Sequence, residues 1–126
     1  MRIWDVAPNL LCRQHLLGEH RELHGLWNIL IVHDGAGGYS RHPETLRWVG
    51  KTRSLYNRHE LLVAEMARRG YRHHSPLDES RVAGGSVQDV LIDPVERQLV
   101  ILAGKPCDCL VGAPVPPPAA SVSPSA

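Results

Sequence analysis

The sequence predicts an all-α fold, a compact single-domain bundle of three to four helices with long loops and a disordered C-terminal tail. Two observations lead to this prediction. Apolar residues recur at the 3.6-residue spacing of amphipathic helices in separate segments, and prolines and glycines stand where these segments begin and end. A chain of 126 residues has room for one hydrophobic core. We therefore expect a helical domain over residues 1–110 and a Pro/Ala/Ser-rich tail over 111–126.

The first helix is expected over residues 8–32, from Pro8, which suits a first helical turn, to the Asp34-Gly35 pair. At about 100° per residue, the apolar side chains fall in one sector, which should face the core: Cys12, Leu16, Leu23, Trp27 and Leu30. A second sector is polar: Gln14, His15, Gly18, Glu19, Arg21, Glu22 and Gly25. Glycine weakens a helix interior, so its two glycines suggest close approach by another backbone or by a substrate.

Two further helices are expected in the middle of the chain. One begins near Pro43, with Trp48 and Val49 on its apolar side and a break near Gly50. The next runs over residues 52–69 and ends at Gly70, a natural left-handed cap. Its apolar stripe keeps the helical period: Leu55, Leu62, Val63 and Met66.

The C-terminal part is less regular. Residues 71–85 are expected to form a loop, and residues 87–92 could be a strand or a helix. A last helix is expected to use Asp93 as its N-cap and Pro94 as its first residue, and to end at Ala103. From residue 113 onward, too few apolar residues recur for packing.

Composition indicates an ordinary globular protein, with 43% hydrophobic and 21% charged residues and a net charge of +1. The charges are unevenly spread: residues 41–72 are mainly basic and residues 78–108 mainly acidic. A basic region can attract phosphates, and it can equally be a solvated helix face.

The three cysteines, Cys12, Cys107 and Cys109, are too few and too oddly spaced for a disulfide framework. We find no secretory signal and no stretch of roughly 20 apolar residues that would span a membrane. These observations favour a cytoplasmic protein.

His15, Arg21 and Glu22 share the polar side of the first helix. A carboxylate beside an arginine and a histidine can act as a general acid or base, although the same trio is a common surface ion-pair arrangement.

His20 and His24 are spaced i, i+4, which can place two imidazoles at one metal ion.

The two histidines project roughly opposite Glu22, so the segment does not reproduce the His-Glu-x-x-His geometry of zinc proteases. A zinc hydrolase would need another ligand from His59, His73 or His74. Cys107-Asp-Cys109 is too closely spaced for the usual zinc knuckle.

Two segments together resemble a known family. The Met-Arg-Ile opening and residues 13–23 (RQHLLGEHREL) are similar to the start of the pyrimidine-dimer DNA glycosylase/abasic-site lyases of the phage endonuclease V type. Residues 58–71 (RHELLVAEMARRGY) resemble the middle helix of that family. The resemblance covers residues 1–34 and 50–74.

The resemblance implies a monomeric α-helical enzyme that acts on damaged double-stranded DNA without a metal or organic cofactor. By motif match, the nucleophile is the α-amine of Met1, which attacks C1′ and forms an imine, and the essential carboxylate is Glu22. We expect Met1 to be retained because Arg2 is bulky. An α-amine has a reference pKa of about 7.7–8.0, so part of it is neutral at pH 7.

DNA contacts are expected from the motif matches and from charge, at Arg2, Gln14, His15, Arg21, Arg47, Lys51, Arg53 and Arg58. The sequence departs from the family in lacking an arginine just after Glu22 and an aromatic, basic C-terminal segment. Both differences affect how the protein would bind DNA and which lesion it would select, so another damaged base could be the substrate. Two alternatives stay open: a non-catalytic DNA- or partner-binding relative, and a metal-dependent helical hydrolase.

Overall fold

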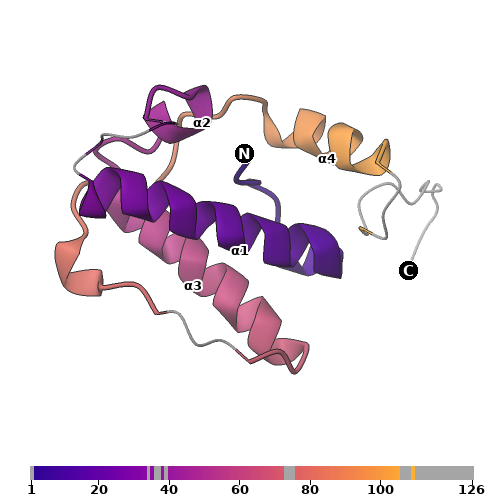
Figure 1. Ribbon diagram of the computed structural model, residues 1–126. Coiled ribbons are helices and arrows are strands. Elements are labelled where there is room, and N and C mark those ends of the chain that lie inside the picture. The colour runs from indigo at the N-terminus through magenta and orange to yellow at the C-terminus, as the bar shows by residue number, and fades with distance from the viewer. Residues whose placement is uncertain are drawn as a thin grey trace.

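The computed structural model describes residues 2–33, 35, 38, 40–72, 76–105 and 109. Over these residues the chain is helical and has no strand, so the expected all-α class is confirmed (Figure 1). The described part contains four α-helices: α1 (Arg13–Trp27), α2 (Pro43–Leu46), α3 (Thr52–Arg68) and α4 (Val95–Ala103). None of its helices has both the length and the apolar character that crossing a membrane requires. The tail expected over 111–126 lies outside the described residues.

The first helix begins later than expected. Pro8 starts a 3-10 turn, η1 (Pro8–Leu10), which closes when the Leu11 N–H donates to the Pro8 carbonyl. Leu11 is then extended, with ψ 140°, and its side chain is buried. The expectation of one helix from residue 8 is therefore wrong, because burying Leu11 turns the chain before Cys12 caps α1. Beyond α1 the helix continues as a π-helical segment, η2 (Asn28–Val32).

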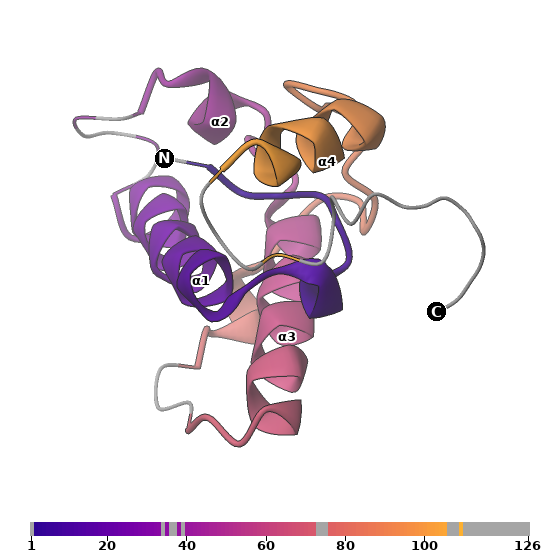
Figure 2. The same ribbon diagram turned by 90° about the vertical axis from the view of Figure 1, so that its right-hand side faces the viewer.

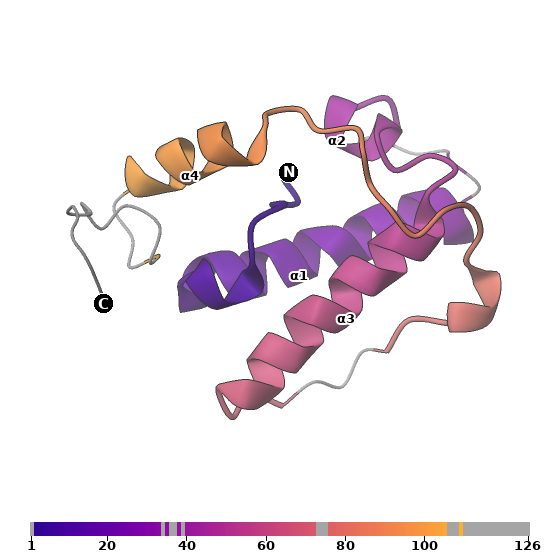
Figure 3. The same cartoon turned by 180° about the vertical axis from the view of Figure 1, so that it is seen from behind.

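The core lies mainly between α1 and α3, which cross each other in Figures 1 and 3. The leucines of the two helices that meet there are fully buried: Leu16, Leu23 and Leu26 of α1, and Leu55 and Leu62 of α3. The helix expected over 52–69 is thus confirmed to within a residue. It ends at Gly70, whose φ of +84° is the left-handed conformation that favours glycine.

The second and last helices differ in detail from the expectation. After α2 the chain turns at Gly50, with φ +74°, so the break there is confirmed. Trp48 is buried as expected, but Val49 is 57% exposed because the turn directs it outward. Pro94, rather than Asp93, is the N-cap of α4. Residues 87–92 form neither helix nor strand.

An extended N-terminal segment, residues 2–7, passes through the middle of the molecule between α1 and α4 (Figure 2). Ile3, Trp4 and Val6 are buried in the core. Long side chains from other elements hold its backbone: Arg47 Nη2 donates to the Ile3 carbonyl at 2.9 Å, and Arg58 Nη1 donates to the Val6 carbonyl at 2.8 Å. The start of the described chain is therefore built into the fold.

Gly84 is a position where the fold requires glycine. Its φ is +84°, and a Cβ placed there would lie 1.9 Å from the Gly50 carbonyl oxygen. We expect Gly84→Ala to lower the free energy of unfolding by at least about 2 kcal/mol, from backbone strain and steric overlap together. Gly85→Ala is the control, because a Cβ at Gly85 meets nothing within 4 Å. Urea unfolding that gave equal stabilities for the two variants would contradict this account.

Glu65, at the end of α3, couples stability to pH. Hydrogen bonds from Arg68 and Arg69 hold the pKa of the buried Glu65 carboxyl at about 2, below its usual 4.5. The folded state therefore binds fewer protons, and this stabilisation is present above pH 4.5 and lost as the pH falls towards 2. The melting temperature of the wild type should exceed that of Glu65→Gln at pH 7, and the gap should narrow below pH 4.5. A gap independent of pH would refute the assignment.

Candidate active site

The polar side predicted for α1 is exposed only in part, because Glu19, expected on it, is buried in the fold. Gln14, Arg21 and Gly25 are exposed, and Glu22 is half-buried. Among the described residues, the glycines on this side do not contact another backbone: a Cβ at Gly25 would meet nothing within 4 Å, and one at Gly18 would meet only the Arg21 side chain, at 3.9 Å. Tight helix packing therefore does not explain them. They leave a shallow face beside Glu22 that a substrate could approach.

Glu22 differs sharply from Glu19, the other carboxylate on this side of α1. Glu19 is 2% exposed and accepts from Arg58 at 2.6 and 3.0 Å and from the Trp4 backbone N–H. Burial raises the pKa of Glu19, and the Arg58 charge opposes that rise. Glu22 has no ion-pair partner within the described residues. Glu19 is thus a structural carboxylate, whereas Glu22 is half-buried and is not committed to an ion pair within the described residues.

The N-terminal segment reaches this part of α1. The Trp4 backbone N–H bonds the Glu19 carboxylate, and the Trp4 ring meets His15 edge-on with centroids 6.0 Å apart. In Figures 1 and 3, which view α1 from the side, the start of the segment is level with the middle of this helix. Three residues of extended chain span at most about 11 Å, and Glu22 lies one helical turn beyond Glu19. Met1 itself lies outside the described residues, so its contact with Glu22 stays a prediction.

Three of the basic residues expected at DNA lie at the surface in ion pairs. Arg2 Nη2 is 2.8 Å from Asp93 Oδ2, Arg53 Nη1 is 2.9 Å from Glu79 Oε2, and Lys51 pairs with Asp89. All three partners come from the acidic region, residues 78–108. Surface pairs of this kind contribute about 1 kcal/mol or less. A phosphate could therefore replace the carboxylates at little cost.

Arg47 and Arg58, also expected at DNA, lie inside the fold. Arg47 Nε donates to Glu44 Oε2 at 2.6 Å, and its Nη2 is 3.1 Å from Asp5 Oδ2. Arg58 is held by Glu19 as described above. Both guanidinium groups are fixed on protein acceptors, so we no longer assign them to DNA contacts. Their sequence context does not distinguish them from surface arginines.

His15 sits between two thiols. Its Nδ1 is 3.2 Å from Cys12 Sγ and 3.2 Å from Cys109 Sγ. Burial, reinforced by the positive charge of Lys105, lowers the pKa of His15. The imidazole is therefore mainly neutral at pH 7, and it would contact DNA as a hydrogen-bonding group rather than as a cation. Cys107, the other cysteine of the Cys-Asp-Cys sequence, lies outside the described residues.

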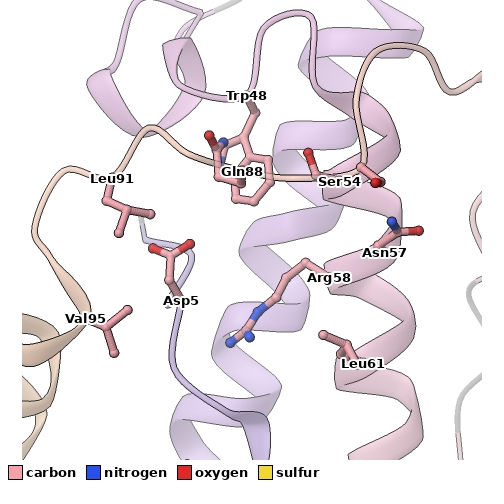
Figure 4. A pocket seen from close by; sticks show the side chains of 10 residues that line it. Asp5, Trp48, Ser54, Asn57, Arg58, Leu61, Gln88, Leu91 and Val95 are labelled. Carbon is pink, nitrogen blue, oxygen red and sulfur yellow. The ribbon is translucent and has the colours of Figure 1, made fainter.

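A pocket of about 300 Å³ opens on another part of the surface, between the N-terminal segment, α3 and the residues that lead to α4 (Figure 4). Asp5 and Arg58 point into it, with Leu91 and Val95 nearby. Both charged groups are occupied by other side chains, Asp5 by Arg47 and Gln98, and Arg58 by Glu19. The pocket does not include Glu22. Because the charged groups of this pocket are already paired, the polar face of α1 is the better candidate for an active site.

Comparison with known proteins identifies a family. A family model described as pyrimidine dimer DNA glycosylase matches residues 1–79, which include the N-terminal segment, α1 and α3. No curated protein and no solved structure matches the chain.

Proposed function

The chain belongs to the pyrimidine dimer DNA glycosylase family, and from this we propose that it is a DNA repair N-glycosylase with abasic-site lyase activity. Its substrate would be double-stranded DNA carrying a damaged, pyrimidine-dimer-like nucleotide. The observation that carries the proposal is the setting of Glu22: a half-buried carboxylate on an open face of α1, one turn from the residue that holds the N-terminal segment.

The proposed reaction uses the α-amine of Met1 and the carboxylate of Glu22. The amine lone pair forms a bond to C1′ while the bond from C1′ to the base breaks, and the base leaves with a proton. Ring opening gives an imine between Met1 and the sugar. Glu22 stabilises the developing positive charge and then removes a proton from C2′, so that the bond from C3′ to its phosphate oxygen breaks by β-elimination. Water hydrolyses the imine and frees the enzyme.

Binding would use the polar face of α1 together with basic groups elsewhere on the surface. We propose that Arg2, Arg21, Lys51 and Arg53 contact phosphates, and that Gln14 and His15 hydrogen-bond the DNA beside the lesion. Extruding a nucleotide and bending the duplex costs a few kcal/mol, which a damaged base pair lowers. Phosphate contacts would offset the remaining cost of extrusion and bending. Because such contacts weaken as salt is added, the affinity for DNA should fall steeply with salt concentration.

The test is cleavage of a labelled duplex that contains one cyclobutane pyrimidine dimer, with an abasic-site duplex and an undamaged duplex in parallel. The proposal predicts strand cleavage of the first two at the lesion and none of the third. Cleavage of the abasic duplex alone would support the lyase step with a different base as substrate. Salt-dependent binding without cleavage of either damaged duplex would reject the enzyme and favour a non-catalytic DNA-binding relative.

Gly25 tests whether DNA approaches this face. A Cβ at Gly25 meets nothing in the described protein, and replacing a helical glycine by alanine stabilises a helix by about 1 kcal/mol. We expect Gly25→Ala to raise the melting temperature, and Gly25→Gln to keep the fold while weakening DNA binding by blocking the face. Unchanged affinity for lesion DNA in Gly25→Gln would show that the duplex does not lie there.

A further inference from the structure

Three histidines from two helices converge at the crossing of α1 and α3. His20 and His24 lie one turn apart on α1, and His59 lies on α3. His24 Nε2 is 3.2 Å from His20 Nε2 and 3.2 Å from His59 Nε2. One ligand atom from each ring lies within 4.8 Å of the other two. One nitrogen of each ring thus lies close to a nitrogen of the other two.

From this geometry we propose that His20, His24 and His59 bind a divalent transition metal ion of the zinc type through their Nε2 atoms. The spacing fits such an ion: two nitrogens bound at 2.0–2.1 Å in a tetrahedral site lie about 3.3 Å apart, close to the two separations of 3.2 Å. The three rings are not stacked in parallel, since His24 is inclined to His59 by 79° and to His20 by 69°, and His20 is inclined to His59 by 32°. Ion binding would be independent of the proposed glycosylase chemistry.

Glu60 supplies the supporting contact that metal-binding histidines usually have. Its Oε2 lies 2.7 Å from Nδ1 of the fully buried His59. A carboxylate at this distance keeps the proton on Nδ1 and leaves the Nε2 lone pair directed at the histidine cluster. Because Glu60 is exposed, this contact can be altered without disturbing the core.

The fourth coordination position would face a pocket of about 380 Å³ lined by Leu17, His20, Arg21 and His24. Three protein ligands and one open position are typical of zinc ions that bind an exchangeable water or an anionic oxygen. Arg21 lines the same pocket, so an anionic oxygen ligand would lie beside a guanidinium group. We therefore expect the fourth ligand to be water, exchangeable for a phosphate or carboxylate oxygen.

Metal content tests this site. The purified protein is stripped with chelator, reloaded with zinc, passed through gel filtration and analysed by elemental mass spectrometry. The variants to compare are His20→Ala and His24→Ala, because both side chains are partly exposed and the fold should tolerate their loss. Replacing the fully buried His59 would also remove core packing. His33→Ala, at an exposed histidine outside the cluster, is the matched control. We expect zinc to stay on the wild type and His33→Ala, and to be lost from both cluster variants.

Two further readouts sharpen the result. Glu60→Gln should weaken zinc binding by roughly 10- to 100-fold in a competition titration, and cobalt loading of the wild type should give the visible absorption of a tetrahedral site. Cys12→Ser separates this site from the group formed by Cys12, His15 and Cys109, which also places three ligand atoms together. The proposal is overturned if the wild type retains no zinc, if His20→Ala and His24→Ala keep it, or if only Cys12→Ser loses it.

Discussion

Glu22→Gln is expected to lower the rate of strand cleavage at a pyrimidine dimer by about 10²–10⁴-fold, the usual contribution of a positioned acid or base. The amide keeps the size of the side chain but can neither take the C2′ proton nor stabilise positive charge at C1′. Because Glu22 has no ion pair with another described residue, its replacement should leave the fold and the melting temperature nearly unchanged. Affinity for lesion DNA should also stay within a few-fold of the wild type.

Glu96→Gln is the matched control, since Glu96 is exposed in the first turn of α4, outside the candidate site. Single-turnover cleavage measured for wild type, Glu22→Gln and Glu96→Gln separates the chemical step from binding and product release. A Glu22→Gln variant that cleaves at the wild-type rate would show that the essential carboxylate lies elsewhere.

Arg58→Met should lower the free energy of unfolding by about 3–5 kcal/mol, because it leaves the buried Glu19 carboxylate without its charged partner. Arg58 donates to Glu19 twice and also to the Val6 carbonyl, so the variant loses the contact between α1, α3 and the N-terminal segment. Activity should fall as well, since this contact holds the segment that carries Met1.

Two companion variants make the Arg58 prediction specific. Arg53→Met removes a surface pair with Glu79 and should cost less than about 1 kcal/mol. Glu19→Leu combined with Arg58→Met removes both buried charges and should be more stable than Arg58→Met alone. Urea unfolding decides between the outcomes: equal losses for Arg53→Met and Arg58→Met would show that the buried pair does not secure the fold.

Features encoded by neighbouring residues could be predicted from the sequence. The helix over 52–69 and its end at Gly70 depend on a local apolar period and a local cap, and both are present in the structure. The exposed positions Gln14, Arg21 and Gly25 of α1 follow from helical spacing in the same way, but the burial of Glu19 among them does not. Where a local signal competed with packing, as when Leu11 turned inward after Pro8, the sequence-based boundary was wrong.

Features that depend on contacts between distant residues could not be predicted. The sequence around Arg47 and Arg58 does not differ from the sequence expected around surface arginines. Only their buried acceptors, such as Glu44 and Glu19, show that these arginines have a structural role. The sequence offered His59, His73 and His74 as possible partners of His20 and His24, and only the crossing of α1 and α3 shows that His59 joins them. The extended N-terminal segment has no periodic signal, since its burial depends on side chains that reach it from other elements.

The central claim is that the α-amine of Met1 is the nucleophile and acts with Glu22. Borohydride reduction during reaction with abasic-site DNA converts an imine into a stable adduct, which peptide mass spectrometry can locate. The sequence contains only two lysines, Lys51 and Lys105, so Lys51→Arg/Lys105→Arg leaves the α-amine as the sole primary amine. With the N-terminus verified by mass, we predict that this variant is trapped on DNA at its first residue. Loss of trapping in it, or an adduct on a lysine of the wild type, would contradict the mechanism.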